Sequence, residues 1–146
     1  MDNDDKRLTN LFYSLKQRGE RKFESKIEFI KWYKKSEVFG CYYCGLEIDI
    51  QRELISNDKI RSKRFFNNLY TTKTGIDKFG TRGRYFEVDR KKPDGPYSKD
   101  NCVLCCYFCN NDKSDVFLDE EYKLFIGASG ENKKDNPRYK YLKSLI

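Results

Sequence analysis

Apolar residues recur at helical spacing near the start of the chain. The positions that follow an i, i+3, i+4, i+7 pattern, and therefore share one face of an α-helix, are Leu8, Leu11, Phe12 and Leu15. The acidic residues that precede them suit the positive end of such a helix. Gly19 follows the last apolar position, so we expect it to close the helix in the left-handed conformation that glycine adopts without strain.

A second helix is predicted to begin at a capping box. In Ser25-Lys-Ile-Glu28, the serine and glutamate side chains can each accept a hydrogen bond from a backbone amide of the first turn. The apolar residues expected along one stripe of this helix are Phe23, Ile27, Ile30 and Tyr33. We therefore assign residues 1–40 to a pair of N-terminal helices.

The middle of the chain predicts short strands and turns in place of long helices. Residues 51–82 are polar and basic with several turn-prone glycines, and we interpret them as an irregular insertion. Residues 83–89 alternate in the manner of a strand, a loop is expected at 92–96, and 102–105 read as a second, antiparallel strand. A helix should follow around Asn110.

The C-terminal part predicts one further helix and an extension. Acidic residues from Asp119 precede apolar residues at helical spacing, and Gly127 is placed to end that helix. Residues 127–137 are rich in Gly, Asn and Lys, which is typical of an exposed link to the segment 139–146. The whole pattern indicates one α+β domain over residues 1–146, with a core at 41–126 and an extension at 127–146.

The charge balance points to a polyanionic partner. Thirty Lys and Arg residues against 23 Asp and Glu give a net charge of +7, spread along the chain rather than confined to a tail. With 16% aromatic residues, this favours nucleic acid over a basic surface that has no ligand. No apolar run is long enough for a membrane span, and the acidic start is unlike a signal peptide. We therefore expect a protein of the cytoplasm that does not enter membranes.

The six cysteines predict a metal site. In the cytoplasm cysteines favour metals or free thiols over disulfides. The first Cys-x-x-Cys is closed by Gly45, and two pairs compete for the second half, at 102/105 and at 106/109. Residues three apart on a strand point to opposite faces, whereas 106 and 109 lie where the chain turns into a helix. The predicted structural Zn²⁺ ligands are therefore Cys41, Cys44, Cys106 and Cys109. Cys102 and Cys105 are assigned to the core.

A set of motifs around these cysteines carries a family resemblance. They are Cys41-x-x-Cys44, Val88-Asp89-Arg90, Tyr97-Ser98, Asn101 and Cys106-x-x-Cys109-Asn110 with Lys113. Together they resemble the HNH, or ββα-metal, endonucleases, in which a hairpin and a helix hold one divalent cation. The resemblance implies a ββα-metal core with flanking helices. It also implies Asp89 and Asn110 as ligands of catalytic Mg²⁺ or Mn²⁺, both of which prefer oxygen donors.

The chain departs from the common family pattern because it contains no histidine. The family's strand acid is usually followed by the histidine that activates water, and Arg90 stands at that position. The Asp-Arg order resembles a branch of restriction endonucleases in which a tyrosine does the work of that histidine. The segment Phe29-Ile-Lys-Trp32-Tyr33 resembles the helix that carries this tyrosine. The resemblance therefore implies Tyr33 as base or nucleophile and Arg90 as a phosphate clamp or an activator of the phenol.

The remaining site residues are predicted from their chemistry. Asn101 is expected to fix the hairpin loop through backbone hydrogen bonds. Side chains expected to contact DNA are Arg61, Lys63, Arg64, Arg82, Arg84 and Lys113.

The function predicted from the sequence is a metal-dependent endonuclease that hydrolyses double-stranded DNA. We expect a homodimeric, sequence-specific type II restriction-like enzyme, encoded by a bacterium or a phage. One alternative is a homing or nicking HNH endonuclease of a phage or mobile element. The other, from a different class, is a zinc-containing DNA-binding protein whose nuclease site has decayed, which the absent histidine would also explain.

Overall fold

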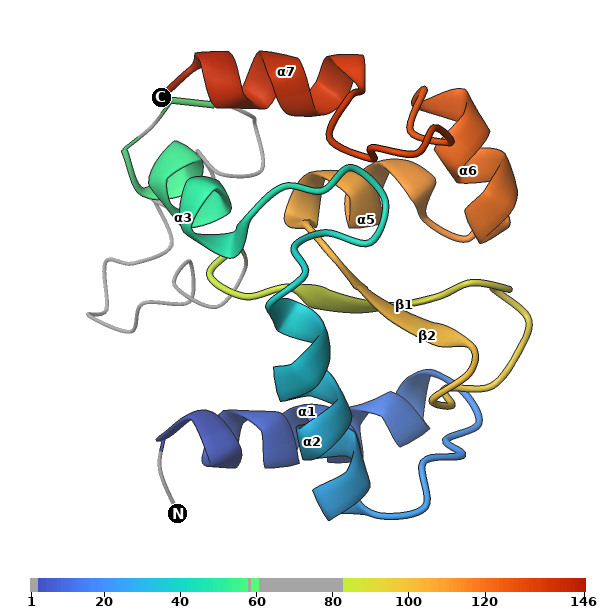
Figure 1. Ribbon diagram of the computed structural model, residues 1–146. Coiled ribbons are helices and arrows are strands. Elements are labelled where there is room, and N and C mark those ends of the chain that lie inside the picture. Colours follow the sequence, from blue (N-terminus) through green and yellow to red (C-terminus); the bar gives the residue numbers. More distant parts are fainter. Residues whose placement is uncertain (1–2, 58, 61–82) are drawn as a thin grey trace.

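A two-stranded hairpin lies at the centre of the computed structural model, which describes residues 3–57, 59–60 and 83–146. In Figure 1 the helices α1 and α2 lie on one side of this hairpin, and the remaining helices lie on the other. The elements, in chain order, are α1 Asn3–Arg18, α2 Lys26–Glu37, α3 Ile48–Ser56, β1 Glu87–Arg90, β2 Cys102–Cys105, α5 Tyr107–Lys113, α6 Asp119–Phe125 and α7 Pro137–Ser144. The α+β class is confirmed.

The hairpin and the helix that follows it form the ββα unit. The strands are antiparallel, and their register pairs Glu87 with Cys105 and Arg90 with Cys102. Side chains alternate along a strand, so Glu87 and Asp89 share one face of β1. The chain leaves β2 and enters α5 at Cys106, whose sulfur accepts a bond from the Cys109 amide at 3.3 Å. Asp89 on the strand and Asn110 on the helix are thereby placed on facing elements.

The N-terminal helices begin and end for mainly local reasons. Ser25 caps α2 by accepting a bond from the Glu28 amide at 3.1 Å, as predicted, while the Glu28 carboxylate accepts from the Glu24 amide at 2.6 Å. The left-handed conformation predicted for Gly19 is wrong, because Gly19 does not have a positive φ. Glycine at this position leaves room for the hairpin loop, because a Cβ would lie 3.1 Å from the Arg90 guanidinium.

An aromatic cluster on α2 and the loop before it belongs to the core that these segments share with α1 and the hairpin. Phe23, Phe29 and Trp32 form ring contacts with centroid separations between 5.1 and 5.8 Å. Ile27, predicted to belong to the same stripe, is 63% exposed. The loop before α2 also pairs with the hairpin loop, because the Tyr97 amide donates to Glu20 O and the Lys22 amide donates to Tyr97 O, each at 2.7 Å. The N-terminal helices are thus attached to the ββα unit by both packing and backbone bonds.

Two regions differ from the sequence expectations. The insertion predicted at 51–82 is helical at its start, since α3 runs to Ser56, and strand β1 begins at Glu87 rather than near Gly83. The segment 127–137, expected to be an exposed link, includes Ala128 and Asn136, both buried. Among the described residues no helix combines the length and the apolar character needed to cross a membrane.

Candidate functional site

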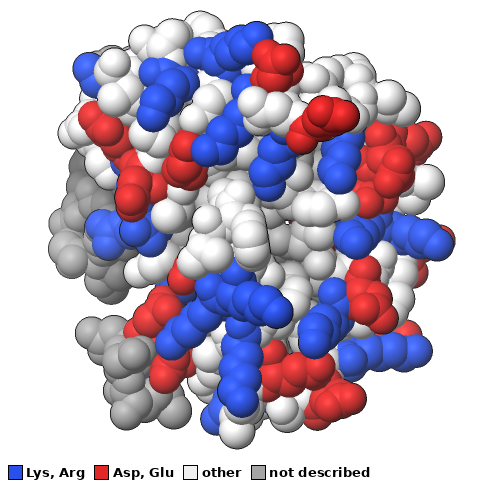
Figure 2. Space-filling model, in the orientation of Figure 1, with Lys and Arg blue, Asp and Glu red and all other residues white. Residues whose placement is uncertain are grey.

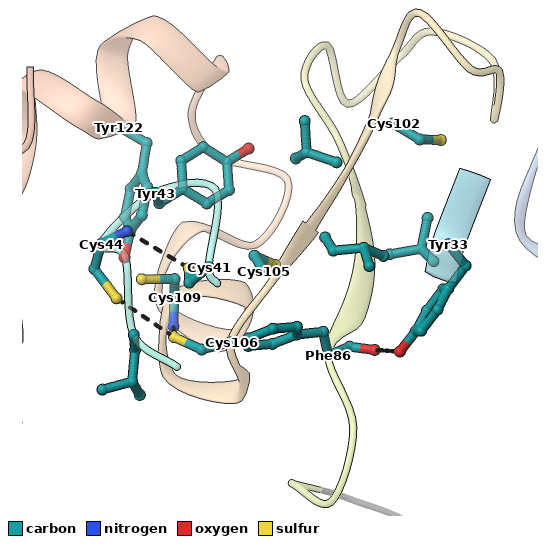
Figure 3. Packing of buried hydrophobic residues seen from close by; sticks show 14 of the residues in the cluster. Tyr33, Cys41, Tyr43, Cys44, Phe86, Cys102, Cys105, Cys106, Cys109 and Tyr122 are labelled. Carbon is teal, nitrogen blue, oxygen red and sulfur yellow. Dashed lines mark hydrogen bonds between the residues drawn. The ribbon is translucent and has the colours of Figure 1, made fainter. Parts of the chain in front are cut away.

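Four cysteines from two distant segments converge at one point. The loop after α2 supplies Cys41 and Cys44, and the start of α5 supplies Cys106 and Cys109 (Figure 3). All four are buried, and their sulfur atoms lie within 4.8 Å of one another. The Cys44 and Cys106 sulfurs are 3.8 Å apart. A tetrahedral Zn²⁺ with bonds of about 2.3 Å to sulfur has ligand separations of roughly 3.8 Å, so this donor set fits the ion.

The other two cysteines lie apart from this group, as expected. Cys102 and Cys105 are buried on strand β2. Burial raises the pKa of the Cys102 thiol to about 12, so that thiol stays protonated and behaves as an apolar core group.

The C-terminal extension covers the four-cysteine cluster. The Asn136 amide donates to the carbonyl oxygen of Cys44 at 3.0 Å. The Arg138 guanidinium donates to the Cys109 sulfur at 3.3 Å and to the Asp112 carboxylate at 2.6 Å. A cationic donor beside a thiolate ligand offsets the negative charge that four thiolates bring to one zinc ion. Arg138 is therefore a site residue that sequence reasoning missed.

Asp89 is held by two donors that come from different segments of the chain. Its Oδ2 accepts bonds from the Tyr43 hydroxyl at 2.5 Å and from the Lys113 ammonium at 3.0 Å. Burial raises the pKa of the Asp89 carboxyl, while the hydroxyl and the ammonium oppose that shift. Lys113 is fully buried and also donates to the carbonyl oxygen of Arg90 at 3.0 Å. The Lys113 charge is used inside the protein, so the predicted DNA contact would require these bonds to break, and it stays a prediction.

Asn110 contacts Glu87, the second acidic residue on the strand face that carries Asp89. Its side-chain amide is hydrogen-bonded to the Glu87 carboxylate. Two adjacent polar pairs therefore join β1 to α5. Glu87 pairs with Asn110, and Asp89 pairs with Lys113. The spacing fits, because residues two apart share one face of a strand and residues three apart share one face of a helix. Sequence reasoning missed Glu87, although its position two residues before Asp89 was a usable signal.

Two adjoining hollows open beside these polar pairs. One, of about 440 Å³, is lined by Asp89, Arg90 and Asn110 together with Arg18 and Tyr97. The other, of about 430 Å³, is lined by residues that include Arg7, Arg18, Phe86, Glu87 and Asn110. Arg18 and Asn110 line both hollows, so we treat the two as one candidate site. Arg18, at the end of α1, is exposed and was not predicted as a site residue.

Arg90 and Asn101 both hold the hairpin loop. The Arg90 guanidinium donates to Gly95 O at 3.1 Å and lies 4.6 Å from the centre of the Tyr97 ring. Its second nitrogen is 3.9 Å from the Asp115 carboxylate. The Asn101 side chain donates to Pro96 O at 2.9 Å and accepts from the Lys92 amide at 3.1 Å. The backbone role expected for Asn101 is present in these bonds.

Tyr33 is close to the site but is closed off from it. Its side chain is fully buried, and its hydroxyl donates to Phe86 O at 2.6 Å (Figure 3). Burial raises the pKa of Tyr33 to about 12, against the opposing effect of the Arg7 guanidinium. Arg7 and Phe86 line the hollow, whereas Tyr33 does not. The catalytic role implied for Tyr33 by the resemblance is not tested by this geometry and stays a prediction.

The remaining residues predicted to contact DNA divide into two groups. Arg61, Lys63, Arg64 and Arg82 lie outside the described residues. Arg84 is exposed, as a phosphate contact requires. On the face shown in Figure 2, Lys and Arg side chains gather over α7 and across the centre but alternate with Asp and Glu. Charge alone therefore does not mark a single binding surface, and the hollows are the better guide.

Comparison with solved structures finds one informative similarity. The chain is similar to the rare-cutting HNH restriction endonuclease PacI, with 25% sequence identity and a TM-score of 0.57. The match covers 86% of this chain and 75% of the PacI chain. The relation to HNH endonucleases implied by the sequence motifs is confirmed at the level of structure. No family model matches the chain, and no curated protein matches it.

Proposed function

We propose that this chain, which has the fold of an HNH restriction endonuclease, is a metal-dependent endonuclease that hydrolyses double-stranded DNA. One observation carries the proposal: in a chain similar to PacI, the hollow lined by Asp89 and Asn110 lies on the hairpin and the helix that follows it, beside three arginines. That combination suits a cation and a phosphodiester in one place.

Asp89 and Asn110 are the proposed ligands of the catalytic cation. Both side chains carry oxygen donors, line the same hollow and come from elements fixed to each other, so the donor set fits Mg²⁺ or Mn²⁺. A cation bound there neutralises charge on the phosphate and on the departing oxygen. Tyr43 and Lys113 both bond to Oδ2 of Asp89, so they fix the orientation of the carboxylate.

Arg18 is the proposed primary contact to the scissile phosphate, with Arg90 fixing the wall of the hollow. The Arg90 guanidinium is already committed to Gly95, Tyr97 and Asp115. Arg18, in contrast, is exposed at the junction of the two hollows. An exposed guanidinium can direct two N–H groups toward one phosphate. This bidentate geometry is available to arginine and not to lysine.

The proposed role of Tyr33 has a structural condition. The Tyr33 hydroxyl donates to Phe86 O in this structure. To act on water or on phosphorus, it must first break that bond and form a contact with the substrate. Arg7, which lies 5.1 Å from the Tyr33 ring and lines the hollow, is the cation that can stabilise the phenolate.

The finer part of the proposal is a homodimeric, sequence-specific type II restriction-like enzyme of the bacterial or phage cytoplasm. Its support is the similarity to PacI, itself a rare-cutting restriction endonuclease. A specific observation favours a second candidate, a zinc-containing DNA-binding protein with a decayed nuclease site. The Lys113 ammonium lies 3.0 Å from Asp89 Oδ2, where it can replace a lost cation.

Cleavage of mixed-sequence duplex DNA separates these candidates. We expect the purified protein to cut with Mg²⁺ or Mn²⁺ and to stop when EDTA is added, and sequencing the ends would identify the recognition site. Asp89→Asn should abolish cleavage while retaining zinc and DNA binding, because the change removes a ligand charge and keeps the shape. DNA binding without cleavage under any divalent cation would support the decayed protein instead.

A further inference from the structure

The segment between the first two zinc ligands reaches the proposed catalytic carboxylate. Tyr43 lies between Cys41 and Cys44, and its hydroxyl donates to Asp89 Oδ2 at 2.5 Å. Both side chains are buried. The Tyr43 hydroxyl thus links the loop that carries two of the proposed zinc ligands to Asp89, the proposed ligand of the catalytic cation.

The Tyr43 ring is fixed on two sides. It packs edge-on against Tyr122, with centroids 5.1 Å apart and planes at 89° (Figure 3). It also packs edge-on against Tyr42, with centroids 5.1 Å apart. The Tyr42 amide donates to Leu104 O on strand β2 at 2.9 Å, which fastens the loop to the hairpin. The position of the ring therefore depends on this loop, which carries Cys41 and Cys44 at its two ends.

Tyr122 extends the connection to the second pair of cysteines. Its hydroxyl donates to the Asp112 carboxylate at 2.9 Å and accepts a bond from Arg138. Arg138 in turn donates to the Cys109 sulfur. The aromatic pair formed by Tyr43 and Tyr122 is thus tied to both halves of the four-cysteine cluster.

We propose that Tyr43 is a positioning residue that couples the zinc site to the catalytic metal site by orienting Asp89. This inference rests on the proposed function, since it takes Asp89 as a ligand of the divalent cation. Lys113 supplies charge to the same oxygen, but Tyr43 supplies a donor whose direction depends on the fold of the zinc loop. The zinc ion therefore acts on the proposed reaction as well as on stability.

The test is Tyr43→Phe, which removes one oxygen and keeps the ring contacts. Tyr42→Phe is the matched control, because Tyr42 is in the same loop but its hydroxyl donates to Asp119 at 3.3 Å. Binding of Mn²⁺ without DNA is measured by electron paramagnetic resonance of the free ion. We expect Tyr43→Phe to retain one zinc per chain and to bind Mn²⁺ about tenfold more weakly. Tyr42→Phe should bind Mn²⁺ like the wild type.

The outcomes separate this inference from the proposed function. Equal Mn²⁺ affinity in Tyr43→Phe and the wild type would overturn the coupling and leave the nuclease proposal intact. Absence of Mn²⁺ binding by the wild type, without DNA and also with duplex DNA present, would overturn both. If Tyr43→Phe does not fold, the equilibrium affinity of the wild type for zinc decides, because coupling between the affinities of two sites is reciprocal. Mg²⁺ should raise that affinity, measured by competition with a chromogenic chelator, in the wild type and not in Asp89→Asn, and no effect in the wild type would refute the coupling.

Discussion

Replacing Tyr33 with phenylalanine separates the structural role of its hydroxyl from a catalytic one. The change removes the 2.6 Å bond to Phe86 O and leaves that carbonyl without its donor inside the protein. An unsatisfied buried acceptor costs about 1–3 kcal/mol, so the free energy of unfolding should fall by that amount at neutral pH. Urea unfolding followed by circular dichroism measures the loss.

The pH dependence of this loss follows from the raised pKa of Tyr33. The folded-state pKa of about 12 exceeds the ordinary value of 10.0, so the stabilisation by the neutral phenol is complete below pH 10. It is lost as the pH rises from 10 toward 12, because the unfolded chain releases this proton first. The stability difference between wild type and Tyr33→Phe should therefore shrink in that window.

The cleavage rate is the second measurement. If the phenolate is the base or nucleophile, Tyr33→Phe should lower the rate constant by about 100-fold or more at saturating Mg²⁺. With a pKa near 12, about one molecule in 10⁴ carries the phenolate at pH 8, so the wild-type rate should rise about tenfold per pH unit. Tyr13→Phe is the control, since Tyr13 is 56% exposed on α1. A Tyr33→Phe variant that is destabilised but cleaves at the wild-type rate would refute the catalytic role.

Three further predictions concern the proposed zinc site and the two hollows. Cys106→Ser should lose zinc and the native fold by elemental analysis and circular dichroism, whereas Cys102→Ser should keep both; equal effects would show that the ligands are wrongly assigned. Arg138→Met should release zinc about tenfold faster into a chelator, because it removes the donor to Cys109, and an unchanged rate would make Arg138 a purely structural residue. Arg18→Gln should weaken DNA binding and reduce the salt dependence by about one counterion, and an unchanged slope would exclude a phosphate contact.

Local features of the fold could be predicted from the sequence. The capping box at Ser25 needs only the residues of one helical turn. The hairpin joins two short strands through a nearby loop, and the Cys-x-x-Cys pairs have the geometry that brings two sulfurs together. In each case the deciding interactions are close in the sequence, apart from the meeting of the two cysteine pairs.

The features that sequence reasoning missed depend on long-range contacts. Lys113 looks like a solvated helix residue until Asp89, from a different element, provides a buried partner. Residues 127–137 have the composition of an exposed link, yet Asn136 is buried because it bonds to the loop of Cys44. The bond between Tyr43 and Asp89 joins residues 46 positions apart and leaves no periodic signal.

Gly19 has no side chain, so a substitution there can be used to alter the neighbouring hollow. A methyl group there would lie 3.1 Å from the Arg90 guanidinium and 3.3 Å from the Tyr97 ring, so both must shift by a few tenths of an ångström. Arg90 and Tyr97 line the hollow, although neither is a proposed metal ligand. Substitution at this one position should therefore change the width of the hollow while keeping Asp89 and Asn110, the proposed metal ligands, in place. Under the proposed function, a graded series from alanine to valine would yield slowed variants suited to trapping a complex with uncut DNA.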